Sequence, residues 1–309
     1  MITRTLIRQK VVQILYAYLL RESNHVEAAE KELSLSLDKA YDLYLYLLLL
    51  MVAVKNFAED RMALRRLRLR PSNEDLNPNM RFVNNRFICQ LEQNSELAER
   101  KKGLKSSWKE ANDVVRNLFE AIESSELYRD YMNAPGEGSY EEDRQFWRKA
   151  YKQFFMDNDT LDELFEEQSL YWNDDKNIID TFVLKTIKQF DPEMGSEQML
   201  LPQYHDQEEP VFAETLLRRA MTYADEYRTA IEEQSKNWTG ERIAFMDTVI
   251  MVTALAETTA FPTIPLSVTL NEYVEIAKFY STPASPSFIN GVLDAAIKKL
   301  RCESTNEKP

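Results

Sequence analysis

Few side chains in this sequence are of the types that catalyse reactions or bind metals. The 309 residues include only two histidines, His25 and His205, and two widely separated cysteines, Cys89 and Cys302. These are too few for a zinc framework, a disulfide scaffold or most transition-metal sites. No serine or cysteine has a histidine in an elbow-like context, and with six glycines no glycine-rich loop follows a strand. The sequence therefore predicts a protein that is not an enzyme and has no metal or cofactor.

Carboxylates are the one abundant group that could do acid–base chemistry. Pairs such as Glu141–Glu142 and Asp174–Asp175 lie within residues 137–209, a segment with 19 acidic and 7 basic residues. In so acidic a segment, a solvated surface is the ordinary interpretation. A more specific interpretation is a region that faces away from nucleic acid or docks on a basic partner.

Basic residues gather elsewhere, although the formal net charge is −13. The first 20 residues carry Arg4, Arg8 and Lys10 and no acid, and residues 61–105 hold 11 bases against 5 acids, including the run "RMALRRLRLR" at 61–70. Phosphate binding responds to the local potential over a Debye length of about 10 Å rather than to net charge. These segments are therefore either solvated helix faces or phosphate contacts.

One stretch, "NEYVEIAKFYSTPASPSFINGVLD" at 271–294, combines an Asn-Glu pair, a Ser/Pro loop and an aromatic residue. Pro265 predicts a helix that begins near Val268–Leu270, and Ser285-Pro286 predicts an N-cap and first turn of the next helix. Phe288 would lie at the start of that helix. It is either a hydrophobic staple or a stacking surface for an unpaired RNA base.

The elements that would position these residues are helices throughout. Apolar residues recur at three- and four-residue spacing from residue 1 to about 301, which predicts an all-α fold. Breaks rich in proline, glycine or polar residues occur at 71–78, 133–139 and 191–210. We expect a core of residues 1–60 and 210–302, a helical insertion at 61–209 and a disordered tail at 303–309.

Two apolar runs need separate interpretation. The first follows Arg4, Arg8 and Lys10 but ends at Arg21-Glu22 without a small-residue cleavage site, so it does not fit a signal peptide. The second, at 43–54, is uncharged for only 12 residues, whereas a membrane span needs about 20. We expect a buried core helix there and a soluble, cytoplasmic protein.

An internal similarity links the acidic segment to the C-terminal part. "EEQSLYW" at 166–172 recurs as "EEQSKNW" at 232–238, an offset of 66 residues. At this offset Phe146 matches Phe212 and Val183 matches Val249. The similarity is either a partial duplication or an accidental likeness of two amphipathic helices.

The stretch around Phe288 resembles the C-terminal signature of the NusB family of transcription antitermination factors. The matching residues are Pro265, Val268, Asn271, Glu272, Glu275, Ala277, Lys278, Ser285, Phe288, Asn290, Gly291, Val292, Leu293 and Asp294. Upstream, "RIAFMDTVIMVTALAE" resembles the preceding helix of the family through Arg242, Ile243, Asp247, Ala254 and Glu257. The N-terminal "RTLIRQKVVQILY" is similar to its arginine-rich first helix.

The resemblance implies an all-α, NusB-like bundle of two subdomains that binds RNA without catalysis. Family members pair with the small-subunit ribosomal protein NusE on the boxA element of nascent ribosomal RNA, and the pair acts on RNA polymerase. By position, Arg4 and Arg8 would contact phosphate, Gln13 and Tyr16 would line the RNA groove, and Phe288 would stack on a base. We add Lys10 from its charge alone.

The sequence also departs from the family pattern. Leu266 and Ser267 replace a common Tyr-Lys, Val252 replaces an arginine, and the loop before Phe288 lacks frequent polar residues. We expect the arginines of 61–70 to replace the lost charge. Two alternatives remain: a scaffold whose RNA surface has degenerated, or an accessory domain of an RNA methyltransferase, for which only seven residues follow position 302.

Overall fold

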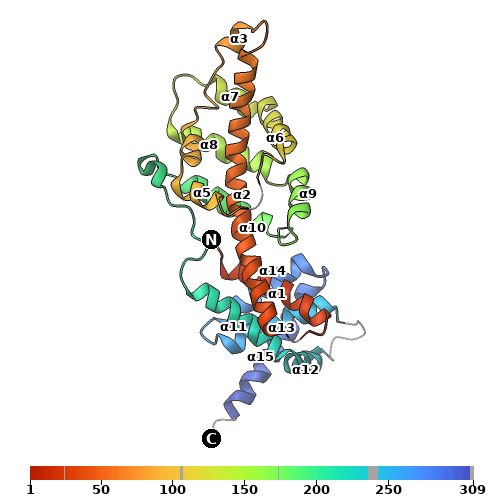
Figure 1. Ribbon diagram of the computed structural model, residues 1–309. Coiled ribbons are helices and arrows are strands. Elements are labelled where there is room, and N and C mark those ends of the chain that lie inside the picture. Colours follow the sequence, from red (N-terminus) through yellow and green to blue (C-terminus); the bar gives the residue numbers. More distant parts are fainter. Residues whose placement is uncertain (24, 105–106, 173, 236–242, 307–309) are drawn as a thin grey trace. The chain divides into compact units, whose positions relative to one another are not determined.

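The computed structural model describes all residues except 24, 105–106, 173, 236–242 and 307–309, and the side chains of 299–306 are also left undescribed. The described residues form helices and contain no strand, which confirms the all-α prediction (Figure 1). Of the tail expected to be disordered, residues 303–306 belong to the last helix and 307–309 lie outside the described part.

The chain divides into two compact units. One contains residues 2–38 and 204–309, and the other contains Met1 and residues 39–203. The 41-residue helix α2 (Val26–Arg66) contributes its beginning to the first unit and the rest to the second. We call these the terminal unit and the inserted unit. Our expected segments, 1–60, 61–209 and 210–302, place the change near residue 60, whereas this division lies at Lys39 within α2.

The terminal unit is built around α13 (Phe245–Ala260). Residues 249–257 of this helix are all buried, because α1, α11, α12, α14 and α15 pack around it. Its sequence "VIMVTALA" is apolar on every side, as a helix covered all round requires. The surrounding helices are α1 (Arg4–Leu20), α11 (Glu208–Thr222), α12 (Ala224–Ser235), α14 (Leu266–Tyr280) and α15 (Ser285–Asn306).

The inserted unit is built on the part of α2 that follows Lys39. The apolar run at 43–54 is largely buried there, as expected for a core helix. Within the described part of the chain, no helix is both long and apolar enough to cross a membrane. The other elements are α3 (Asn73–Leu76), α4 (Arg86–Glu92), α5 (Ser95–Lys101), α6 (Asn112–Ser124), α7 (Glu126–Asn133), α8 (Tyr140–Ala150), the π-helix η1 (Tyr151–Phe155), α9 (Asp159–Gln168), α10 (Lys176–Gln189) and the 3-10 helix η2 (Pro192–Glu197).

Helix boundaries in the two units agree at the 66-residue offset. Shifting α9 (159–168) by 66 gives 225–234, and α12 is Ala224–Ser235. The buried pair Leu161 and Phe165 of α9 then corresponds to the buried pair Tyr227 and Ile231 of α12. Likewise, α8 with η1 corresponds to α11, and α10 corresponds to α13. This agreement favours duplication over accident, although residues 236–238 of the second motif lie outside the described part.

The glycine-rich break at 133–139 is an ordered loop that two arginines hold. Arg81 Nη1 donates to the carbonyls of Ala134 and Gly136, at 2.7 and 3.3 Å, and Arg86 Nη2 donates to those of Glu137 and Gly138. Gly138 has a φ of +70°, and a Cβ there would lie 2.6 Å from Arg81 Nη2. A side chain at this position would therefore strain the backbone and displace the guanidinium group.

We expect Gly138→Ala to destabilise the inserted unit by more than Gly136→Ala. Gly136 also has a positive φ, +74°, but a Cβ there meets nothing within 4 Å. The control therefore carries only the left-handed backbone penalty of about 1–2 kcal/mol, whereas Gly138→Ala adds the clash with Arg81. Urea unfolding of the full chain measures both, and equal losses would contradict the steric role.

Candidate functional site

A buried ion pair joins the first helix to the centre of the terminal unit. Arg8 Nε and Nη2 donate to the two carboxylate oxygens of Glu257 at 2.7 and 2.9 Å. The side chains of Arg8 and Glu257 are 4% and 0% exposed. Thr269 and Tyr273 of α14 donate to the same carboxylate, at 2.9 and 3.0 Å. One carboxylate on α13 therefore fixes α1 and α14 together.

The electrostatics of this cluster keep its donors protonated. Burial by itself would lower the pKa of Arg8, but the hydrogen bond and the charge of Glu257 outweigh it and raise that pKa above its ordinary value. Burial, with the charge of Glu257, raises the pKa of Tyr273 well above 10. The bidentate geometry and the additional donors offset the desolvation of the two charges.

The three predicted cationic residues occupy different environments. Arg4 is partly exposed and pairs with Glu208 at 3.2 Å. Arg8 is enclosed by the Glu257 cluster and also lies 3.3 Å from Glu272, so its guanidinium group is not available to a phosphate in this structure. Lys10 is 1% exposed. Of the three expected phosphate contacts, only Arg4 therefore has a surface position, because α1 is covered on several sides, including those of Arg8 and Lys10.

Two other predicted residues of α1, Gln13 and Tyr16, contact the end of α14 and the start of α13. Gln13 Nε2 donates to the hydroxyl of Tyr280 at 2.9 Å, and both side chains are half-buried. Tyr16, also half-buried, contacts the edge of Phe245 with ring centroids 5.2 Å apart. Sequence reasoning singled out Gln13 and Tyr16 but missed Tyr280 and Phe245. Their types were visible, but no spacing rule connects positions so far apart in the chain.

Asp247 fixes the junction between α14 and α15. It is buried, and it accepts hydrogen bonds from the hydroxyls of Ser281 and Ser285, the latter at 2.9 Å. We expected Ser285 to be an N-cap, but its hydroxyl bonds to Asp247 and α15 begins at Ser285 itself. Helix α14 begins at Leu266, slightly before the expected Val268.

The Asn271-Glu272 pair, which begins the stretch 271–294, has a structural role through Glu272. Its carboxylate accepts a hydrogen bond from Thr5 Oγ1 at 2.9 Å and lies near Arg8. Asn271 is exposed. The contact of Glu272 therefore adds a second link between α14 and α1.

Phe288 lies in the first turn of α15, three residues after Ser285. It is half-buried, so the ring is not sealed inside the core. The first turn of α13 links Tyr16 to the start of α15, because Phe245 contacts Tyr16 and Asp247, two residues later, accepts a hydrogen bond from Ser285. We call Gln13, Tyr16, Tyr280 and Phe288 the recognition edge.

The recognition edge offers rings, a hydroxyl and an amide, which are groups that can stack on a ligand or hydrogen-bond to it. Among the described residues, no three His, Cys, Asp or Glu side chains gather as metal ligands would. Burial raises the pKa of the Cys89 thiol, which disfavours the reactive thiolate. Arg242, which the sequence comparison also matched, lies outside the described residues.

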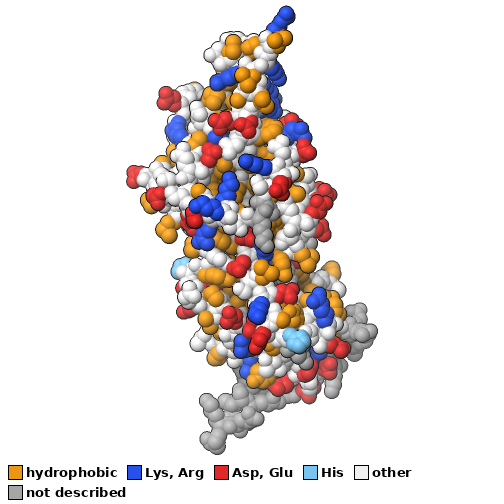
Figure 2. Space-filling view, viewed as in Figure 1, with side chains coloured by type: hydrophobic (Ala, Val, Ile, Leu, Met, Phe, Trp, Pro, Cys, Tyr) orange, Lys and Arg blue, Asp and Glu red, His pale blue; other side chains and the backbone are white. Residues whose placement is uncertain are grey.

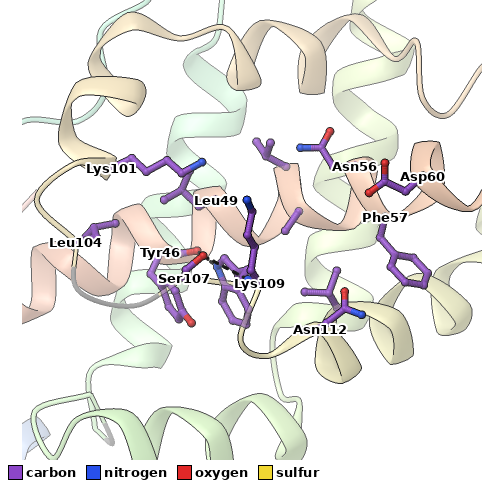
Figure 3. Close-up of a pocket in the computed structure, with 14 residues that line it drawn as sticks. Tyr46, Leu49, Asn56, Phe57, Asp60, Lys101, Leu104, Ser107, Lys109 and Asn112 are labelled. Atoms are coloured by element: carbon purple, nitrogen blue, oxygen red, sulfur yellow. Dashed lines mark hydrogen bonds between the residues drawn. The ribbon is translucent and has the colours of Figure 1, made fainter.

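The inserted unit contains a separate groove of about 310 Å³ along α2 (Figure 3). Tyr46 and Trp108 both line it and stack on each other, with ring centroids 4.1 Å apart. Leu49 and Phe57 line the groove with aliphatic and aromatic surface, and Lys101 and Lys109 also line it. Asn56, Asp60, Ser107 and Asn112 add polar groups to the lining. The stretch 271–294, which carries the family-like signature, belongs to the terminal unit, so we do not place the main site in this groove.

Comparison with known proteins points to one family. A model described as "NusB family" matches residues 181–298. A protein named transcription antitermination protein NusB in Geotalea daltonii is 37% identical over 133 residues, which cover 43% of this chain and 89% of that protein. Proteins of the same name in Geobacter sulfurreducens and Koribacter versatilis are 38% and 41% identical, covering 34% and 32% of this chain and 81% and 68% of theirs. No solved structure matches the chain.

We expect Arg8→Ala to destabilise the chain by about 3–5 kcal/mol, because it leaves the buried Glu257 carboxylate without its cation. Arg4→Ala is the matched control, since the exposed pair with Glu208 contributes only about 0–1 kcal/mol. Chemical unfolding followed by circular dichroism measures both free energies. A loss at Arg8 no larger than that at Arg4 would contradict the positioning role.

Proposed function

The chain belongs to the NusB family, and we propose that it acts in transcription antitermination by binding single-stranded, boxA-type RNA together with the ribosomal protein NusE. The observation that carries this proposal is the recognition edge, where Gln13 of α1 bonds to Tyr280 of α14 and the first turn of α13 contacts both Tyr16 and the turn that carries Phe288. An edge of partly exposed rings beside hydrogen-bonding groups suits unpaired bases, because every base has a face that can stack.

Each side chain of the edge has a proposed role. Phe288 stacks on a base, and Tyr16 forms a second wall of the RNA groove. Gln13 and Tyr280, already 2.9 Å apart, present an amide and a hydroxyl to base edges. Arg4 contacts a phosphate after exchanging Glu208 for it. Arg8 and Lys10 act from below the surface as positioning residues.

The remaining partners follow from the same proposal. NusE binds beside the RNA, and RNA polymerase is reached through that complex rather than directly. The protein works in the cytoplasm and requires no cofactor.

A scaffold with a degenerate RNA surface is the second candidate function. Two observations favour it: Arg8 and Lys10 are buried, and Leu266 and Ser267 lie where the family often has Tyr-Lys. Fewer surface cations mean fewer released counterions and weaker RNA binding. Titration with a boxA-like RNA, with and without purified NusE, separates the two functions, because a scaffold binds no RNA in either case.

We expect Phe288→Ala to weaken binding of a boxA-like single-stranded RNA by about tenfold, since stacking on an aromatic residue contributes about 1–3 kcal/mol per base. Phe279→Ala is the matched control, because Phe279 is 74% exposed on the neighbouring α14 and is not part of the recognition edge. Fluorescence anisotropy measures the affinities, and thermal unfolding confirms that both variants remain folded. Equal affinity of the folded Phe288 variant and the wild type would contradict the stacking role.

A further inference from the structure

The inserted unit ends in a projecting segment, residues 64–76, that we call the tip. It comprises the last turn of α2, the residues after it and α3, and it is the end of the unit labelled α3 in Figure 1. Leu64, Leu67 and Leu69 are 68%, 81% and 99% exposed, and Leu76 is also exposed. Figure 2 shows basic and hydrophobic side chains next to one another at this end.

The tip is ordered by its own polar contacts. Ser72 and Asp75 form a reciprocal capping box on α3, with N–H to oxygen distances of 2.9 and 3.0 Å. Arg68 lies 3.6 Å from Asp75, which ties the preceding residues to α3. The leucines are therefore presented from a fixed backbone, so binding through them requires little ordering of the chain.

The chemistry of the tip favours a protein partner over RNA. Residues 58–81 contain no aromatic side chain on which a base could stack, and a phosphate contact alone would leave four leucines in water. The tip has four arginines and no lysine, a preference typical of protein interfaces. Arg66 and Arg70 form no ion pair with any described residue. A fitting partner carries carboxylates beside exposed apolar groups.

The same unit carries such a surface on α9. Asp159, Glu163 and Glu166 follow one another at i, i+4 and i+7 as a stripe on the exposed side of the helix, and Leu170, two residues after the helix ends, is 83% exposed. None of these three carboxylates pairs with a described cation. The opposite side of α9 is fixed to the unit through Phe165, which contacts the rings of Trp108 and Trp172.

We propose that the tip docks on the α9 stripe of a second copy of this chain. Arg66 and Arg70 pair with the carboxylates of α9, and the exposed leucines of the tip contact the region of Leu170. The contact is complementary in charge and buries apolar surface that is otherwise exposed on both partners. It involves only residues of the inserted unit, none of which belongs to the recognition edge.

Sedimentation velocity of the full chain tests this contact. We expect association that depends on protein concentration and weakens as salt is raised. Reversing the charge of the tip with Arg66→Glu/Arg70→Glu weakens association by about tenfold or more, and so does reversing the charge of the α9 stripe with Glu163→Arg/Glu166→Arg. The matched control is Lys185→Glu/Lys188→Glu, which makes the same charge change as the tip reversal at exposed positions of α10 and leaves association unchanged.

Mixing the two reversed proteins provides the decisive arm. Each tip then meets an α9 stripe of opposite charge, so association is restored to within a few-fold of the wild type. A wild-type chain that remains monomeric overturns the proposal, as does a mixture that fails to associate. A chain that is monomeric but whose tip reversal lowers the salt dependence of RNA binding would assign the tip to RNA instead.

Discussion

The buried pair of Arg8 and Glu257 is the interaction on which the terminal unit depends. It joins residues 249 positions apart, and Glu272, 3.3 Å from Arg8, adds a second carboxylate to the same guanidinium group. Because Thr269 and Tyr273 donate to the Glu257 carboxylate, the pair also sets the position of α14 relative to α1. The recognition edge lies on these same two helices and on α15. Its geometry therefore follows from a contact that is itself inaccessible to RNA.

Two kinds of polar residue alternate along the sequence of α1: some pack in the core, and others reach the surface. Arg8 and Lys10 are buried on different sides of α1, whereas Gln13 and Tyr16 are only half-buried. A cation in an arginine-rich helix is thus not automatically a phosphate ligand. Whether such a cation can bind phosphate depends on the group that it already pairs with. The partner of Arg8 is the buried carboxylate of Glu257. A second buried acid, Asp247, has a similar role at the α14–α15 junction. It orients Ser281 and Ser285, while the nearby Phe288 remains partly exposed.

Much of the fold was predictable from the sequence, because the signals involved are local. The three- and four-residue spacing of apolar residues predicted the helices, and the uncharged run at 43–54 indicated a core helix. The burial of Arg8 was not predictable, since it depends on Glu257, which local periodicity cannot pair with it. The same holds for Tyr280, whose hydroxyl meets Gln13 only after α1 and α14 pack. The predicted break at 133–139 does separate α7 from α8, but its composition gave no sign that Arg81 and Arg86 would hold its backbone.

The central claim is that unpaired RNA lies along α1 and the α14–α15 junction, on a surface that the buried ion pair organises. Photo-crosslinking of a 4-thiouridine-substituted, boxA-like RNA to the full chain, with mass-spectrometric mapping, tests it most directly. We predict cross-links at Tyr16, Tyr280 or Phe288, and fewer of them in competition with unmodified RNA. Cross-links confined to the inserted unit, or none at all under conditions where RNA binds, would contradict the account.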